Sequence, residues 1–189
     1  MTRLPEVIDL GPDEEAKRLW TGALNARKSA TDDIIAVCAL LDLGLRSAEI
    51  LAIQLLQPVK DRFPATIGVL LDTPLPEVDA HRDAISVPHT LQFTDMIDLL
   101  SAEELECVSP GMHRGWEDRR FSCRRSRVTA QEAIGVTLDT GERDRLLLLS
   151  AYRNRIFRHP PPIRVNTTQI LDAFDTLIGL VEGMRRKTV

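Results

Sequence analysis

The run Ile34–Leu56, IIAVCALLDLGLRSAEILAIQLL, decides the fold of this chain of 189 residues. Apolar side chains fill most of its positions, so we predict a buried helix. Asp42, Arg46 and Glu49 interrupt the run, and these charges argue against a membrane span. Gly44 lies near the middle, where we expect the helix to bend or split.

Helix-starting and helix-breaking residues flank this run on both sides. A first helix is predicted from Pro12 to about Lys28, because proline and acidic residues favour a first helical turn. Ser29 and Asp32 have the spacing of a capping box and are expected to open the long apolar helix. Pro58 and Pro64 then end it. Residues 13–57 are therefore predicted to hold the N-terminal helices.

The middle of the chain, residues 58–128, is predicted to consist of loops and an insertion. The segment TIGVLLDT, residues 66–73, fits a helical turn or a strand equally well. TLQFTDMIDLL, residues 90–100, has a helical pattern, and the next residues, 101–104, have a capping pattern for another short helix. Residues 109–128 are polar and basic, and we expect an irregular insertion or a hairpin with a small β element there.

The last part of the chain, residues 129–186, is predicted to hold two further long helices. Three pairs have capping-box spacing there: Thr129 with Glu132, Asp139 with Glu142, and Asn166 with Gln169. After the last pair, apolar residues recur at helical spacing and form one stripe: Ile170, Phe174, Leu177, Ile178, Val181 and Met184. Residues 1–189 are therefore predicted to form one mainly α domain, an irregular helical bundle.

The overall composition indicates a soluble cytoplasmic protein. The net charge is −4, so nucleic acid would have to be bound by a local patch. Among the 24 basic residues only Lys17, Lys28, Lys60 and Lys187 are lysines. The three cysteines are far apart, which predicts no disulfide framework and a reducing compartment. The N-terminal segment lacks the apolar core of a signal peptide, and no membrane partner is expected.

The stretch Ser150–His159, SAYRNRIFRH, places several cationic side chains at the end of a leucine-rich helix, directly before three prolines. Arg153 needs a partner or an opening to solvent, because a lone charge in a core is costly. His159 precedes Pro160, and a residue before proline is pushed out of the helical conformation. The helix is therefore expected to end there and to free the His159 ring to turn toward Arg153, with Asn154 beside it.

The segment Arg153–His159, RNRIFRH, resembles the Arg-x(4–6)-His motif of HEPN domains, in which asparagine often follows the arginine. These domains are helical bundles of toxin–antitoxin, abortive-infection and CRISPR-linked defence systems, and many are metal-independent endoribonucleases. The resemblance implies that Arg153, Asn154 and His159 are the catalytic residues. His159 would move a proton at the ribose 2′-hydroxyl or the leaving oxygen, Arg153 would stabilise the charged phosphate, and Asn154 would orient one of the two. It also implies an RNA substrate, a homodimer with facing motifs, and an antitoxin or defence-complex partner.

The motif spacing alone is weakly specific, since Arg82 and His89 also fit it. The second match lies in a proline-bearing segment without a helical pattern, so we set it aside. In an alternative interpretation, Arg153 and Arg155 pair with acids such as Asp144 or Glu132, and His159 caps the helix. A non-catalytic interaction subunit of a defence or regulatory complex, or a helical enzyme of another class, then replaces the ribonuclease.

The segment from His113 to Arg127, HRGWEDRRFSCRRSR, is the clearest basic cluster of this acidic chain. Guanidinium groups bind phosphates, and aromatic rings stack on unpaired bases. We therefore predict that it contacts RNA, together with Arg155 and Arg158 near the motif. The candidate RNA-binding residues of the cluster are Arg114, Trp116, Arg119, Arg120, Arg124, Arg125 and Arg127. The alternative is a solvated insertion whose charge Glu117 and Asp118 partly offset.

No metal or cofactor is predicted. Cys107, His113 and Cys123, with His81 or His89, are the side chains of zinc-ligand type, but their spacings match no familiar zinc pattern. The sequence also lacks a glycine-rich phosphate loop, a GxSxG nucleophile motif and an HExxH metalloprotease motif.

Overall fold

The computed structural model describes residues 12–68, 71, 93–102, 124–158 and 165–188. These residues are mainly helical, as predicted, and form no strand; an isolated bridge joins Ser101 to Leu138. Of the expected irregular insertion or hairpin, residues 109–128, the part 109–123 lies outside the described residues. The prediction is wrong for 124–128, which form the first turns of a helix. The α-helices are α1 (Pro12–Arg27), α2 (Ile34–Leu56), α4 (Phe93–Leu100), α5 (Arg124–Ile134), α6 (Thr140–Arg158) and α7 (Thr167–Thr188). Two short helical turns, η1 (Gln57–Arg62) and η2 (Pro64–Gly68), follow α2.

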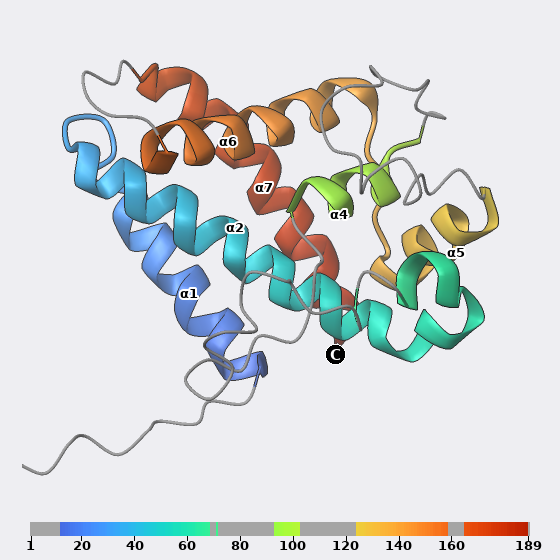
Figure 1. Cartoon of the computed structure of the whole chain (residues 1–189). Coiled ribbons are helices and arrows are strands. Elements are labelled where there is room, and N and C mark those ends of the chain that lie inside the picture. The colour runs from blue at the N-terminus through green and yellow to red at the C-terminus, as the bar shows by residue number, and fades with distance from the viewer. Residues whose placement is uncertain (1–11, 69–70, 72–92, 103–123, 159–164, 189) are drawn as a thin grey trace, which may run out of the picture.

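The burial predicted for Ile34–Leu56 is confirmed, and among the described helices α2 is central, because it contacts α1, α4, α5, α6 and α7. Figure 1 shows α1 running antiparallel beside α2, with α6 and α7 on another side and α4 and α5 toward its C-terminal end. Most of the buried hydrophobic side chains belong to one cluster around this helix. The largest of them include Leu40, Leu41, Leu45, Leu56, Phe93 and Phe174. The apolar stripe of α7 is also confirmed, with Ile178 alone only partly buried.

Two of the predicted capping boxes are wrong, and both errors concern where a helix begins. Asp33, rather than Ser29, caps α2, because its side chain accepts a hydrogen bond from the Ile35 amide at 2.8 Å. Ser29 instead contributes its carbonyl to a turn that receives the Asp33 amide at 3.1 Å. Thr129 lies in the middle of a helix, since α5 already begins at Arg124.

The other two predicted helix starts are confirmed. The Asp139 side chain accepts from the Glu142 amide at 2.8 Å, and the Glu142 side chain accepts from the Asp139 amide at 3.0 Å. This is the reciprocal pattern of a capping box. Asn166 accepts from the Gln169 amide at 3.1 Å, while the Gln169 side chain accepts from the Tyr152 hydroxyl at 3.2 Å. Gln169 thereby joins the start of α7 to the last turns of α6.

The split considered at Gly44 is absent, because α2 continues through it as one helix. The glycine serves a close contact instead: a Cβ at this position would lie 2.8 Å from Cε2 of Phe174 on α7. Phe174 in turn stacks on Trp20 of α1, with ring centroids 5.7 Å apart. The missing side chain of Gly44 therefore lets α1, α2 and α7 share one aromatic contact.

We expect Gly44→Ala to destabilise the protein, although alanine is the better helix former. Its Cβ would overpack the contact with Phe174, which costs about 1–3 kcal/mol and exceeds the gain of about 1 kcal/mol in helix propensity. Gly179 is the matched control, because it is exposed within α7 and an added Cβ would meet nothing within 4 Å. Gly179→Ala should raise the free energy of unfolding. Urea denaturation measures both, and equal stabilisation by the two variants would contradict the close contact at Gly44.

Candidate functional site

Arg153 of α6 and Glu49 of α2 form an ion pair that is largely withdrawn from solvent. The Nη1 atom of Arg153 lies 3.4 Å from Oε1 of Glu49, and the side chains are 19% and 18% exposed. The same oxygen of Glu49 accepts a hydrogen bond from the backbone N–H of Phe93 at 2.9 Å. Since Phe93 is the first residue of α4, one carboxylate oxygen connects three helices.

The helical periodicity of α6 explains why Arg153 points toward the core. Leu146, Leu149 and Ser150 are buried on the face of α6 that packs inward. Arg153 follows Leu149 by four residues and Ser150 by three, so it lies on this same face. Glu49 lies similarly on α2, between buried Ala48 and Leu51. The two charged residues therefore meet because each is fixed on the packed side of its own helix.

Glu49 is under opposing electrostatic influences. Burial raises the pKa of its carboxyl group above the usual value for glutamate, while the charges of Arg153 and Arg46 and the Phe93 amide lower it; burial prevails. The carboxylate also lies at the N-terminus of α4, where the helix dipole favours negative charge. Burial thus makes the Glu49 carboxyl group costly to ionise, and the guanidinium of Arg153 lies beside it to offset part of that cost.

The remaining motif residues lie in different environments. Asn154 and Arg155 are exposed on α6. The side chain of Arg158, the last residue of α6, and the whole of His159 lie outside the described residues. The predicted helix end before the prolines agrees with the observed bounds of α6, whereas the approach of His159 to Arg153 stays a prediction.

The alternative interpretation named Asp144 or Glu132 as acidic partners of Arg153. This prediction is wrong, because the acidic partner of Arg153 is Glu49. Asp144 contacts Arg143, and Glu132 is exposed on α5. The sequence did contain a signal for Glu49, since it is a charge within the most apolar run of the chain and so needs a partner. It did not reveal which arginine would supply that partner.

Among the residues of the predicted RNA-binding cluster, Arg127 is the one whose side chain is described. It is only 8% exposed, and its guanidinium donates to the backbone carbonyl of Ser101 just beyond α4. The Gln131 side chain donates to the same carbonyl at 3.0 Å. Arg127 therefore supplies a hydrogen-bond donor to a backbone carbonyl at the C-terminal end of α4. The sequence did not reveal this structural role. Its contact with RNA stays a prediction, as do those of the cluster residues outside the described part.

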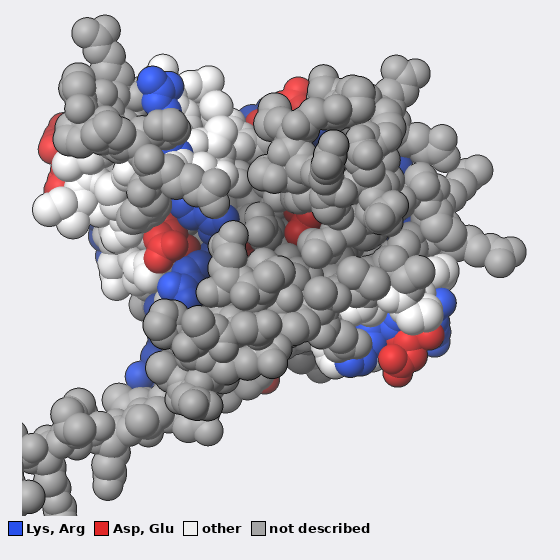
Figure 2. All heavy atoms as spheres, in the orientation of Figure 1, with Lys and Arg blue, Asp and Glu red and all other residues white. Residues whose placement is uncertain are grey.

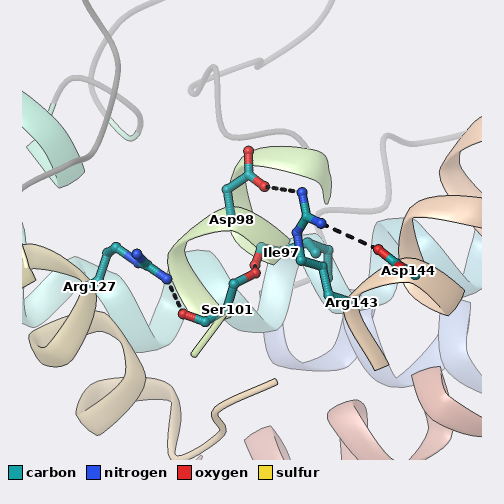
Figure 3. A network of polar contacts seen from close by, with 6 residues as sticks. All are labelled: Ile97, Asp98, Ser101, Arg127, Arg143 and Asp144. Carbon is teal, nitrogen blue, oxygen red and sulfur yellow. Dashed lines mark hydrogen bonds and ion pairs between the residues drawn. The ribbon is translucent and has the colours of Figure 1, made fainter. Parts of the chain in front are cut away.

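A second charged network surrounds this end of α4 (Figure 3). Arg143 of α6 reaches Asp98 of α4 at 4.0 Å and its neighbour Asp144 at 3.3 Å. Burial raises the pKa of the Asp98 carboxyl group, and the charges of Arg143 and Arg127 oppose this shift. The network joins α4, α5 and α6, and its acids neutralise its arginines.

Charges of both signs are interspersed over the described part of the surface in Figure 2. Such mixing gives a weaker long-range field than a patch of one sign.

Within the described ranges, His, Cys, Asp and Glu side chains form no group of three that could hold a metal ion. The zinc alternative named Cys107, His113, Cys123, His81 and His89, which all lie outside those ranges. In the same part of the chain, no helix combines the length and the apolar character needed to cross a bilayer.

No family model, curated protein or solved structure matches this chain. The resemblance to HEPN domains thus rests on the sequence of the Arg-x(4–6)-His motif and stays a prediction.

Proposed function

We propose that this protein is a HEPN-like metal-independent endoribonuclease of a toxin or antiviral defence system. The observation that carries the proposal is the placement of Arg153, which Glu49 holds on the inner face of α6 while its side chain keeps 19% of its surface open to solvent. A guanidinium group restrained in this way is suited to stabilise charge on a phosphate, because its orientation is set before the substrate binds.

In the proposed reaction, RNA is cleaved by acid–base chemistry at the ribose 2′-hydroxyl. Arg153 stabilises the charge on the phosphate, His159 transfers a proton, and Asn154 orients one of these groups. Arg155 and Arg158 follow Arg153 in the sequence and contribute positive charge for the RNA backbone. Two copies of the chain pair so that their motifs face one cleft, and an antitoxin or defence-complex partner controls the activity in the cytoplasm.

The test is cleavage of RNA by the purified chain in the presence of EDTA. His159→Ala should lower the cleavage rate by about 10²–10⁴-fold, the usual contribution of a general acid or base. His89→Ala is the matched control, because His89 belongs to the second spacing match and should leave the rate unchanged. Undiminished cleavage by His159→Ala would overturn the assignment of the catalytic residue.

A non-catalytic interaction subunit is the second candidate, and two observations favour it. Arg153 already has an acidic partner in Glu49, which is sufficient to explain its presence in α6. Ile34 and Ile35 at the start of α2 are 49% and 74% exposed, and exposed apolar side chains often mark protein-binding surfaces. A wild-type chain that leaves RNA intact, and whose expression leaves bacterial growth unchanged, would favour this candidate.

A further inference from the structure

We propose that Glu49 is a further catalytic residue, the general base that takes the proton from the ribose 2′-hydroxyl. This inference rests on the proposed function and deepens it, because it divides the acid–base work between two groups. Glu49 would act as the base and His159 as the acid that protonates the leaving oxygen. The motif by itself gives no indication of this division, since Glu49 lies 104 residues before Arg153 in the chain.

The two oxygens of Glu49 differ in their surroundings. Oε1 receives both the Phe93 amide and Arg153, so it anchors the side chain. For Oε2, the described residues provide no hydrogen-bond donor, and the side chain as a whole is 18% exposed. A general base must lie within hydrogen-bond reach of the proton that it removes, about 2.6–3.2 Å between heavy atoms. Oε2 is the oxygen that neither of these two contacts uses.

The position of Arg153 determines what would lie next to Oε2. The guanidinium group has five N–H donors in one plane, and the contact with Glu49 involves Nη1. Other donors of the same group can therefore hold a phosphate oxygen while the pair persists. The attacking 2′-hydroxyl and the phosphate belong to one nucleotide, so a phosphate on Arg153 brings that hydroxyl close to Glu49.

The proposed step balances without a metal or a further reactant. The O–H bond of the 2′-hydroxyl breaks, its proton passes to Oε2 of Glu49, and a bond forms between the 2′-oxygen and phosphorus. The bond from phosphorus to the 5′-oxygen breaks, and this oxygen takes a proton from His159. The products are a 2′,3′-cyclic phosphate and a 5′-hydroxyl end. Water then returns Glu49 and His159 to their starting protonation states.

The charges around Glu49 are compatible with this role. Arg153 approaches from α6, Arg46 lies on α2 itself, and the Phe93 amide approaches from α4. Burial outweighs these three influences and raises the pKa of the carboxyl group. A base accepts protons more effectively when its pKa lies closer to the working pH.

The test compares the full-length wild-type chain with Glu49→Gln across a pH series, using RNA cleavage and thermal melting as readouts. Glutamine keeps an oxygen for Phe93 and Arg153 but does not titrate. We expect the cleavage rate to fall about 10²–10⁴-fold, with little change in KM, and the decline of the rate at acid pH to disappear. Glu132→Gln on the exposed side of α5 is the matched control and should retain the wild-type rate and profile.

Glu49→Asp keeps the proposal testable if the glutamine variant fails to fold, because it retains a titrating carboxylate on a shorter side chain. It should cleave more slowly than wild type and still lose activity at acid pH. A Glu49→Gln variant with the wild-type rate, or with a lower rate but an unchanged acid decline, would overturn the role as base and leave His159 in place. A wild-type chain that does not cleave RNA would overturn both this role and the proposed function.

Discussion

Phe174→Ala is expected to remove about 3–5 kcal/mol from the free energy of unfolding, as for other buried phenylalanines. Phe174 is fully buried, stacks on Trp20 and fills the space above Gly44. Its removal would open a cavity where α1, α2 and α7 meet. Because small domains are stable by only about 5–15 kcal/mol, the variant should lose a large part of its stability. Urea or guanidinium denaturation measures this loss.

The control for this prediction is Phe174→Leu, which keeps most of the apolar volume. Its loss should be clearly smaller, since hydrophobic exchanges of similar volume usually cost less than about 1.5 kcal/mol. If Phe174→Ala and Phe174→Leu were equally stable, the aromatic contact would not be the centre of the packing. The slope of the unfolding transition should stay constant, which would show that the variants differ in stability rather than in folding cooperativity.

Arg153→Ala is expected to lower the free energy of unfolding by about 2–3 kcal/mol near neutral pH, somewhat below the cost of breaking a fully buried ion pair. The change would leave Glu49 withdrawn from solvent without its cation, and would raise the pKa of that carboxyl group further. A carboxyl group with a raised folded-state pKa makes the protein less stable as the pH rises from its unfolded pKa to its folded pKa. The loss should therefore be small at acid pH, where Glu49 is protonated in both states, and largest above the folded-state pKa.

Arg155→Ala is the matched control for this second prediction, because Arg155 is exposed on the same helix two residues later. It should change the stability by no more than about 0.5 kcal/mol. Chemical denaturation of both variants at several pH values measures how each loss of stability depends on pH. A pH-independent loss for Arg153→Ala, or one equal to that of Arg155→Ala, would contradict the ion pair with Glu49.

The central and final helices could be predicted from the sequence because their apolar residues follow a strong helical period. The helix starts at Asp139 and Asn166 were also predicted, since a cap acts within four residues of the chain. Two other starts were predicted wrongly: Asp33 caps α2 in place of Ser29, and Thr129 has the spacing of a cap but lies inside α5. In both cases local spacing alone does not identify which candidate is used.

Contacts between distant residues account for what the sequence did not reveal. Gly44 appeared to be a breaking point because Phe174, on a helix far along the chain, cannot be recognised as its neighbour. Likewise, the alternative interpretation paired Arg153 with acids of the C-terminal segment, whereas packing places it beside Glu49 of α2. Helix formation depends on near neighbours, but the candidate site depends on how two helices are arranged against each other.

The junction at the end of α4 has a consequence for how this protein can vary. The Ala102 amide donates to Leu138 at 2.8 Å, and Arg127 and Gln131 of α5 donate to the Ser101 carbonyl. The chain is therefore anchored to the bundle on both sides of residues 103–123. The same junction also ties α4 to α5, so a substitution that removes the Arg127 or Gln131 side chain would loosen both helices at this point.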